Sequence, residues 1–362
     1  MYHWGKALTQ QKAEARKRVL LIHTGGTLGM QVPQGTRLDL GSEQQLERML
    51  QRVPELGEMA DLDLIAPWNL DSSDVGPRHW RELAQLIVEE GGVGRRDAAG
   101  ELEGYHGIVV IHGTDTLSYT ASALSFMLRG LDRPVVLSGS QRPLEAWRSD
   151  ARTNLASAVE CATLEIPEVV VVFGDRVLRG NRSAKIDATS YSAFGSPSVP
   201  EIAKIGTDLE VAWRRVRRPE RSFCLQPNLD SRVLALTVFP GMNPRMVRQA
   251  VLAAPKDKRI KALVIRGFGV GNVPTQGPGD LRPLIESFGE AGIPIVIMSQ
   301  CYRGHVDMRV YPSGRELLAA GAITARDMTF EAAITKTMWA LGQPEKSLAQ
   351  WFDLNLAGEV TL

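Results

Sequence analysis

Short apolar runs rich in β-branched residues alternate along the chain with stretches of helical periodicity. Strands that alternate with helices in this way form mostly parallel sheets covered by helices. The pattern therefore predicts an α/β fold, with strands at residues 19–22, 108–111, 135–137 and 169–173.

Two segments illustrate the helices. Pro77 can open a helix because the first turn needs no N–H from it, and the apolar residues behind it recur at helical spacing: Trp80, Leu83, Ala84 and Ile87. An earlier helix is predicted behind a capping-box pair, Ser42 and Gln45, with one buried face formed by Leu46, Met49, Leu50 and Val53.

The periodicity fades between residues 206 and 230, where arginines crowd and Pro219 and Pro227 interrupt any helix. We interpret this segment as a solvated connector, although a basic cluster could instead bind phosphate or nucleic acid. Further strands are predicted at 233–238, 262–265 and 295–298. A chain of 362 residues has room for two domains. We expect a larger N-terminal domain at 1–207 with a mostly parallel sheet flanked by helices, a linker at 208–228, and a smaller C-terminal α/β domain at 229–362.

Composition narrows the partners and the compartment. The 42 Lys and Arg residues nearly balance the 41 Asp and Glu residues, which favours a small neutral or zwitterionic ligand over nucleic acid or a membrane surface. Three widely spaced cysteines indicate a reducing compartment, so we expect a cytoplasmic protein. The first eighteen residues lack the apolar stretch of a secretory signal, and no apolar run approaches the roughly 20 residues of a membrane span.

Three polar clusters follow predicted strands: HTGGTLGM at 23–30, DSSD at 71–74 and HGTDT at 112–116. In open α/β sheets, ligands bind beyond the carboxyl ends of the strands. We therefore expect the three clusters to meet around one site.

Thr27 is the first candidate for chemistry. Gly25 and Gly26 allow a sharp turn that brings backbone N–H groups close to a ligand and leaves the Thr27 hydroxyl in the open space. The alternative is an ordinary glycine turn or a weak phosphate loop, although neither GxGxxG nor GxxxxGK[ST] is matched.

Thr114, Asp115 and Thr116 precede a long helical pattern, so they could simply cap a helix. A hydroxyl beside a carboxylate is also what a nucleophile or a water-activating group requires. The sequence leaves both interpretations open.

A threonine hydroxyl needs a base, and we expect packing roles for the nearby His23 and His112. Lys185 is the alternative base, as in serine–lysine hydrolases, although a lysine is more often a surface charge. The sequence has neither the metal motifs HExxH and CxxC nor the GxSxG elbow of α/β hydrolases.

The DSSD cluster has two interpretations of equal weight. Asp71 could face an α-ammonium group while Ser72 and Ser73 face an α-carboxylate, or the cluster could be a polar turn before the helix at Pro77.

Together these clusters resemble the bacterial-type L-asparaginase family, specifically its type I cytoplasmic branch. The similarity extends over nearly the whole chain through further motifs: VVLSGSQRPL with RSDARTNL, LRGNRSAK, VIRGFGVGN at 264–272 and SQCYRGHVDM at 299–308.

The resemblance implies hydrolysis of L-asparagine to L-aspartate and ammonia through an acyl-enzyme, with no cofactor and no metal. It makes Thr27 the nucleophile and groups Thr114, Asp115 and Lys185 as an activating triad. It also assigns the substrate's α-groups to four residues: Asp71, Ser72, Ser73 and Asp115. It further implies a homodimer or homotetramer.

One loop of this chain departs from the family's pattern, and a group of three residues matches a further feature of some relatives. The family often carries a tyrosine in the loop after the first threonine, whereas residues 30–40 contain none and Thr36 lies near that place. Arg266, Ser299 and Cys301 match positions where some type I relatives bind asparagine allosterically. The alternative for Cys301 is a small buried hydrophobic residue at a strand end.

Three competing functions remain. The chain could be a mixed glutaminase–asparaginase, or the amidase subunit that supplies ammonia for glutaminyl-tRNA synthesis, which usually carries an extra N-terminal domain. We disfavour the second because only about eighteen residues precede the first strand here. A non-catalytic asparagine-binding regulator is disfavoured because Thr27, Thr114, Asp115 and Lys185 are all present.

Overall fold

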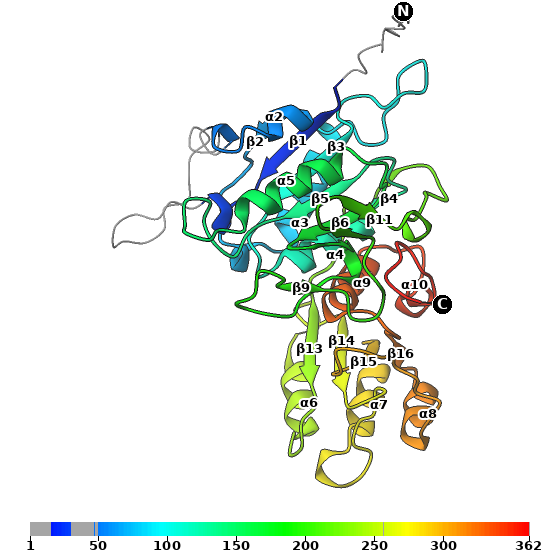
Figure 1. Ribbon diagram of the computed structural model, residues 1–362. Coiled ribbons are helices and arrows are strands. Elements are labelled where there is room, and N and C mark those ends of the chain that lie inside the picture. The colour runs from blue at the N-terminus through cyan, green and yellow to red at the C-terminus, as the bar shows by residue number, and fades with distance from the viewer. Residues whose placement is uncertain (1–15, 30–46, 48–49, 256, 362) are drawn as a thin grey trace, which may run out of the picture.

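The computed structural model describes residues 16–29, 47, 50–255 and 257–361. Figure 1 shows a larger α/β part that contains the N-terminal half of the chain and a smaller part below it, with helices α9 and α10 where the two meet. This arrangement confirms the predicted fold of two unequal α/β units.

The larger part is built on an eight-stranded sheet with the order β11-β10-β7-β6-β5-β3-β1-β2. The pairs from β2 through β1, β3 and β5 to β6 are parallel, and the remaining pairs are antiparallel. The parallel strands are β1 (Arg18–His23), β2 (Asp61–Ile65), β3 (Gly107–Ile111), β5 (Val135–Ser138) and β6 (Val169–Phe173). The antiparallel strands are β7 (Arg176–Arg179), β10 (Ala203–Ile205) and β11 (Leu209–Val211).

Helices cover both faces of this sheet because consecutive strand residues point to opposite sides. Leu20 and Ile22 of β1 pack into one core with α3 (Pro77–Glu89) and α4 (Leu117–Met127). Val19 and Leu21 pack into a second core with α2 (Leu56–Met59) and α5 (Ala151–Ala162). Helix α3 begins at Pro77 and buries the four residues predicted for its inner face.

The smaller part holds a parallel four-stranded sheet with the order β13-β14-β15-β16, where β13 is Val233–Thr237, β14 is Ala262–Gly267, β15 is Ile295–Ser299 and β16 is Ile323–Thr324. Its outer core involves α6 (Pro244–Ala253), α7 (Arg282–Glu290) and α8 (Pro312–Ala319). The other face of the sheet packs on α9 (Phe330–Leu341), which also lies against α4 and contacts α10 (Leu348–Phe352). One apolar core therefore runs through both parts.

Residues 208–228, predicted as a linker, run along the larger part. They contain β11 at the edge of its sheet and β12 (Cys224–Leu225), which pairs with β4 (Leu128–Arg129). The domain boundaries themselves stay a prediction. Within the described part of the chain, we find no helix with the length and apolar character needed to span a membrane.

Candidate active site

The three polar clusters lie side by side beyond the ends of β1, β2 and β3, as predicted. The backbone N–H of Thr24 donates to the carbonyl of Ile111 at 3.0 Å, and the N–H of Leu70 donates to the carbonyl of Thr24 at 3.1 Å. Gly25 continues this contact by forming a bridge with Leu70. The parallel strands thus deliver all three loops to one edge of the sheet.

Glycines allow these loops to touch. Gly26 has a φ of +92°, and a Cβ built on it would lie 2.5 Å from the Cα atom of Gly113. A Cβ on Gly113 would in turn lie 2.6 Å from Oγ of Ser72. Side chains larger than hydrogen would therefore push the loops apart. Thr27 begins the short 3₁₀ turn that follows, η1 (Thr27–Gly29), and is partly buried there.

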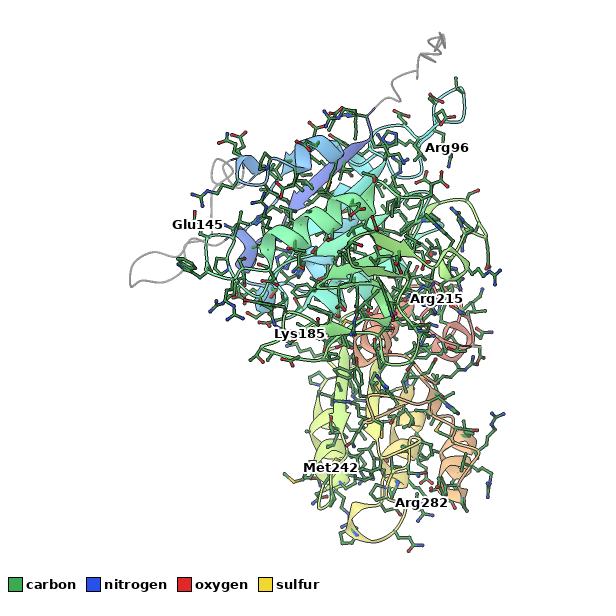
Figure 2. The ribbon with its side chains drawn as sticks, viewed as in Figure 1. Arg96, Glu145, Lys185, Arg215, Met242 and Arg282 are labelled. Carbon is green, nitrogen blue, oxygen red and sulfur yellow. The ribbon has the colours of Figure 1, made fainter. Side chains whose placement is uncertain are left out.

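Lys185 joins the third cluster from a distant part of the chain. Its Nζ atom donates to Oγ1 of Thr114 at 2.9 Å and contacts Oδ1 of Asp115 at 2.7 Å. The lysine lies on the two-residue strand β8 (Ala184–Lys185), which pairs with β9 (Phe194–Gly195). Figure 2 places Lys185 at the end of the larger part that is nearest to the smaller one. The surface-charge interpretation of this lysine is therefore wrong.

Burial differs sharply within this group. Thr114 is 7% exposed and the Lys185 side chain is 21% exposed, whereas the Asp115 side chain is 66% exposed. The lysine thus connects an inner hydroxyl with an outer carboxylate. A buried hydroxyl, a cation and an accessible carboxylate are the components that activate a nucleophile and hold a cationic ligand group.

Helix capping does not explain the HGTDT cluster. Among the described residues, no side-chain oxygen caps the first turn of α4, although Thr116 occupies the capping position. The Thr116 hydroxyl donates instead to the carbonyl of Ser72 at 2.6 Å, and the N–H of Asp115 donates to Oγ of Ser72 at 3.3 Å. These contacts fasten the second and third clusters together.

The DSSD cluster forms a turn before α3, and substrate binding by its side chains stays a prediction. The Asp71 carboxylate accepts hydrogen bonds from the backbone N–H of Ser73 at 2.8 Å and from its hydroxyl at 2.7 Å, and it caps the 3₁₀ turn η2 (Ser72–Asp74). These bonds, the backbone one first, lower the pKa of Asp71. The carboxylate is therefore held in a fixed direction and ionised at neutral pH, while Ser72 is buried against Asp115.

The two histidines are buried beneath the site. Desolvation lowers the pKa of His23 and the pKa of His112 to about 4, so both imidazoles are neutral at pH 7. Nδ1 of His112 lies 2.7 Å from the carbonyl oxygen of Gly113, and Nε2 lies 2.9 Å from the Thr120 hydroxyl. The expected packing role is thus supported for His112.

Gln141 is a site residue that the sequence reasoning missed. Its Oε1 atom accepts from the Thr114 hydroxyl at 3.4 Å, and its amide nitrogen donates to the carbonyl of Ser190 at 3.1 Å. The Asp150 carboxylate accepts from the backbone N–H of Gln141 at 2.9 Å, which fixes this loop behind β5. In the sequence, its position just after a buried strand could have indicated that it belongs to the site.

Comparison with known proteins identifies the family of this chain. Residues 18–217 match the family model described as Asparaginase, N-terminal, and residues 232–352 match the Glutaminase/Asparaginase C-terminal domain. The chain belongs to the asparaginase family.

Individual family members are similar over almost the full length of this chain. L-asparaginase 1 of Escherichia coli is 36% identical over 357 residues, which cover 96% of this chain and 98% of that protein. A glutamyl-tRNA(Gln) amidotransferase protein of Pyrococcus abyssi is 35% identical, with 95% of this chain and 76% of that protein covered. The crystal structure of L-asparaginase I from Vibrio cholerae superposes with a TM-score of 0.81 at 34% identity and covers 96% of this chain and 100% of its own. The resemblance to the type I branch is thus confirmed.

Arg266, Ser299 and Cys301, the three residues predicted as a possible regulatory site, lie at the carboxyl ends of β14 and β15. Arg266 lies with its guanidinium carbon 5.0 Å from the centre of the Phe330 ring, and its Nε atom is buried. The Ser299 hydroxyl accepts from the N–H of Cys301 at 2.9 Å. Cys301 is exposed, so its interpretation as a buried hydrophobic residue is wrong.

Two expectations lie outside the described residues: the tyrosine-free loop with Thr36, and the start of the helix predicted behind Ser42 and Gln45.

Proposed function

We propose that this member of the asparaginase family hydrolyses the side-chain amide of L-asparagine to L-aspartate and ammonia, with Thr27 as the nucleophile. The observation that carries the proposal is the double contact of Lys185 Nζ, to Oγ1 of Thr114 at 2.9 Å and to Oδ1 of Asp115 at 2.7 Å. This contact lies beside the glycine turn that carries Thr27.

In the first half of the reaction, the Thr27 oxygen forms a bond to the amide carbon and loses its proton. The tetrahedral intermediate carries a negative oxygen that preorganised donors stabilise. The carbon–nitrogen bond then breaks, and the nitrogen leaves as ammonia after it has taken up a proton. The product is an aspartyl ester of Thr27, which water hydrolyses to release aspartate and restore the hydroxyl.

Thr114, Lys185 and Asp115 act as the activating triad. Lys185 acts in its neutral amine form and accepts the proton of the Thr114 hydroxyl, and Thr114 in turn withdraws a proton from Thr27 or from the attacking water. Asp115 compensates the positive charge on the lysine at 2.7 Å. Before this transfer the Thr114 hydroxyl donates to Oε1 of Gln141 at 3.4 Å, which orients it.

The α-groups of the substrate fit the outer wall of the site. Asp115, whose side chain is 66% exposed, and the oriented carboxylate of Asp71 can face an α-ammonium group. The Ser72 hydroxyl, whose oxygen accepts from the N–H of Asp115, can donate to an α-carboxylate, and the Ser73 hydroxyl can do so when it exchanges its bond to Asp71 for one to the substrate. A free amino acid is therefore a better match than an amide that lacks charged groups.

We also propose where the enzyme acts, how it assembles, how its domains are divided and where it is regulated. The enzyme acts in the cytoplasm as a homodimer or homotetramer, and its domains follow the predicted boundaries at 1–207 and 229–362. Arg266, Ser299 and Cys301 form a regulatory site for asparagine. The buried Nε atom of Arg266 and the exposed position of Cys301 support this assignment.

The test is ammonia release by the purified protein from L-asparagine and from L-glutamine, with Thr27→Ala and Thr114→Ala as companion variants. We expect strong preference for asparagine, and a loss of kcat on the order of 10²-fold or more in each variant. Equal rates with both amides would instead support the mixed glutaminase–asparaginase. Binding of asparagine without release of ammonia from either amide would support the regulator.

A further inference from the structure

A buried arginine lies three residues before Lys185. Arg182 ends the short 3₁₀ turn η3 (Gly180–Arg182) and is 2% exposed. Its Nε donates to the carbonyl of Gly358 at 2.7 Å, Nη1 lies 3.0 Å from Oδ2 of Asp327, and Nη2 donates to the Thr361 hydroxyl at 3.3 Å. The guanidinium group is thus held by the C-terminal segment and by the residues that lead into α9.

The C-terminal segment, residues 355–361, is itself fixed from inside the protein. The Glu359 carboxylate accepts from the N–H groups of Leu356 and Ala357 and lies 2.6 Å from Nζ of Lys336 on α9. Both side chains of this ion pair are fully buried. A buried charge pair with this many partners is expensive to displace. The segment therefore forms a rigid support.

Two neighbours of Arg182 complete the connection to the site. The Asn181 side-chain amide donates to the carbonyl of Ala357 at 3.0 Å. On the other side, Oγ of Ser183 lies at hydrogen-bond distance, 3.1 Å, from Oγ of Ser118, in the first turn of α4 shortly after Thr114 and Asp115. The short segment that carries Lys185 is thus held between the C-terminal segment and α4.

The segment needs this external support. Strand β8 is only two residues long and pairs with another two-residue strand, so the backbone ladder alone does little to fix Lys185. The Lys185 contacts with Thr114 and Asp115 require its Nζ to stay within about 3 Å of both. A displacement of about one ångström is enough to reduce an enzyme's rate strongly.

We propose that Arg182 and the C-terminal segment 355–361 position Lys185 for catalysis, so that the last residues of the chain set the turnover rate without contacting the substrate. The inference rests on the proposed function, in which Lys185 is the base of the activating triad. Arg182 is a positioning residue, and Thr361 and Asp327 hold it in place. Figure 1 shows the C-terminus beside α9 and α10, where the two parts of the molecule meet.

The test compares steady-state kinetics with L-asparagine for three variants of the full chain. Arg182→Lys keeps the charge and removes the fork that reaches Gly358 and Thr361. We expect kcat to fall about 10- to 100-fold while KM changes little, because the ground-state contacts of the substrate are untouched. Thr361→Val keeps the shape of the side chain and removes only its hydroxyl, and we expect a smaller fall in kcat. Lys185→Met removes the proposed base and shows how far kcat falls without it.

Arg133→Lys is the matched control. Arg133 is also almost fully buried and donates to backbone carbonyls, among them that of Glu103 at 2.8 Å, but it lies just before the amino end of β5, at the opposite edge of the sheet. We expect a lower melting temperature with an unchanged kcat. All rates are measured at a temperature where circular dichroism shows every variant fully folded.

Wild-type kcat in both folded Arg182→Lys and folded Thr361→Val would overturn the inference while leaving the proposed function intact. An equal fall of kcat in Arg133→Lys would also overturn it, because the effect would then reflect general loosening. Wild-type kcat in Lys185→Met would show that the lysine is not the base, and it would overturn the inference as well.

Discussion

Thr114 and Asp115 are neighbours in the sequence, and each has an ordinary structural explanation until Lys185 is placed between them. The lysine contacts a hydroxyl that is almost buried on one side and a carboxylate that is mostly exposed on the other. The same three side chains scattered over a surface would not be held in these positions relative to one another. The contacts among these three side chains therefore indicate function more strongly than their residue types do.

The two buried histidines predict how stability depends on pH. Burial lowers the pKa of His23 and of His112 from 6.5 to about 4 in the folded protein. Between pH 6.5 and 4 the unfolded chain binds these protons and the folded chain does not, so the free energy of unfolding falls as pH decreases through this window. The loss is roughly 3 kcal/mol for each histidine. Urea unfolding at about pH 7, 5.5 and 4.5 measures it.

His112→Gln isolates one of the two contributions, and His305→Gln serves as its control because His305 is exposed. We expect the pH dependence between 6.5 and 4 to be shallower in His112→Gln and unchanged in His305→Gln. An unchanged pH dependence in His112→Gln would show that this imidazole titrates normally in the folded protein.

The sequence alone could identify the candidate site residues, but only some of the residues that they contact. Thr27, Thr114, Asp115 and Lys185 stand in recognisable motifs, and the last three are in contact. Gln141 was missed because a glutamine after a strand has no distinctive pattern until its amide is seen against the Thr114 hydroxyl. The roles of Thr27 and of the substrate-binding residues stay predictions.

Among the elements, the loops at the sheet edge determine how closely the reactive groups approach. Gly26 combines a φ of +92° with a hypothetical Cβ only 2.5 Å from the Cα atom of Gly113. Gly100 has a similar φ of +84° but has open space around it. A comparison of Gly26 with Gly100 therefore distinguishes the cost of a side chain at positive φ from the cost of a steric clash.

We therefore expect Gly100→Ala to lower the free energy of unfolding by about 1 kcal/mol and to leave activity unchanged. Gly26→Ala should be more destabilising because the backbone of Gly113 cannot move aside cheaply, and its ammonia release should fall by an order of magnitude or more as Thr27 is displaced. Denaturant unfolding and ammonia assays on both variants check this. Wild-type activity in Gly26→Ala would show that the close contact does not position Thr27.

The long elements were predictable and the short ones were not. Helix α3 carries its apolar residues at regular spacing over thirteen residues, so its inner face could be identified in full. Strands β8, β9 and β12 have two residues each, which is too short for any periodicity, and β12 pairs with a segment far away in the chain. The strand that carries Lys185 therefore became visible only in the structure.

Across the whole molecule, α9 is the element that both parts share. It packs on the sheet of β13 and β14 on one side and on α4 on the other. Trp339 on α9 is 1% exposed and lies 4.9 Å from the Trp351 ring centre and 6.2 Å from that of Phe126. The sequence predicted two unequal α/β units, but it could not show that the C-terminal helices complete the core of the larger one.

This shared core predicts cooperative unfolding. Trp339→Ala should lower the free energy of unfolding by roughly 3–5 kcal/mol and should shift the melting of the entire molecule, because the cavity opens in a core that both parts use. Thermal melts followed by circular dichroism and by residual activity check this. Trp147→Ala is the control, since Trp147 is 90% exposed. A second transition that Trp339→Ala leaves unmoved would show that the two parts unfold independently.

The most direct test of the central claim is to trap the covalent intermediate during turnover of L-asparagine. Rapid acid quenching followed by peptide mass spectrometry should find an aspartyl group on the peptide that contains Thr27, and none in Thr27→Ala, which should also release no ammonia above background. An aspartyl group on Thr114, or full ammonia release by Thr27→Ala, would contradict the account.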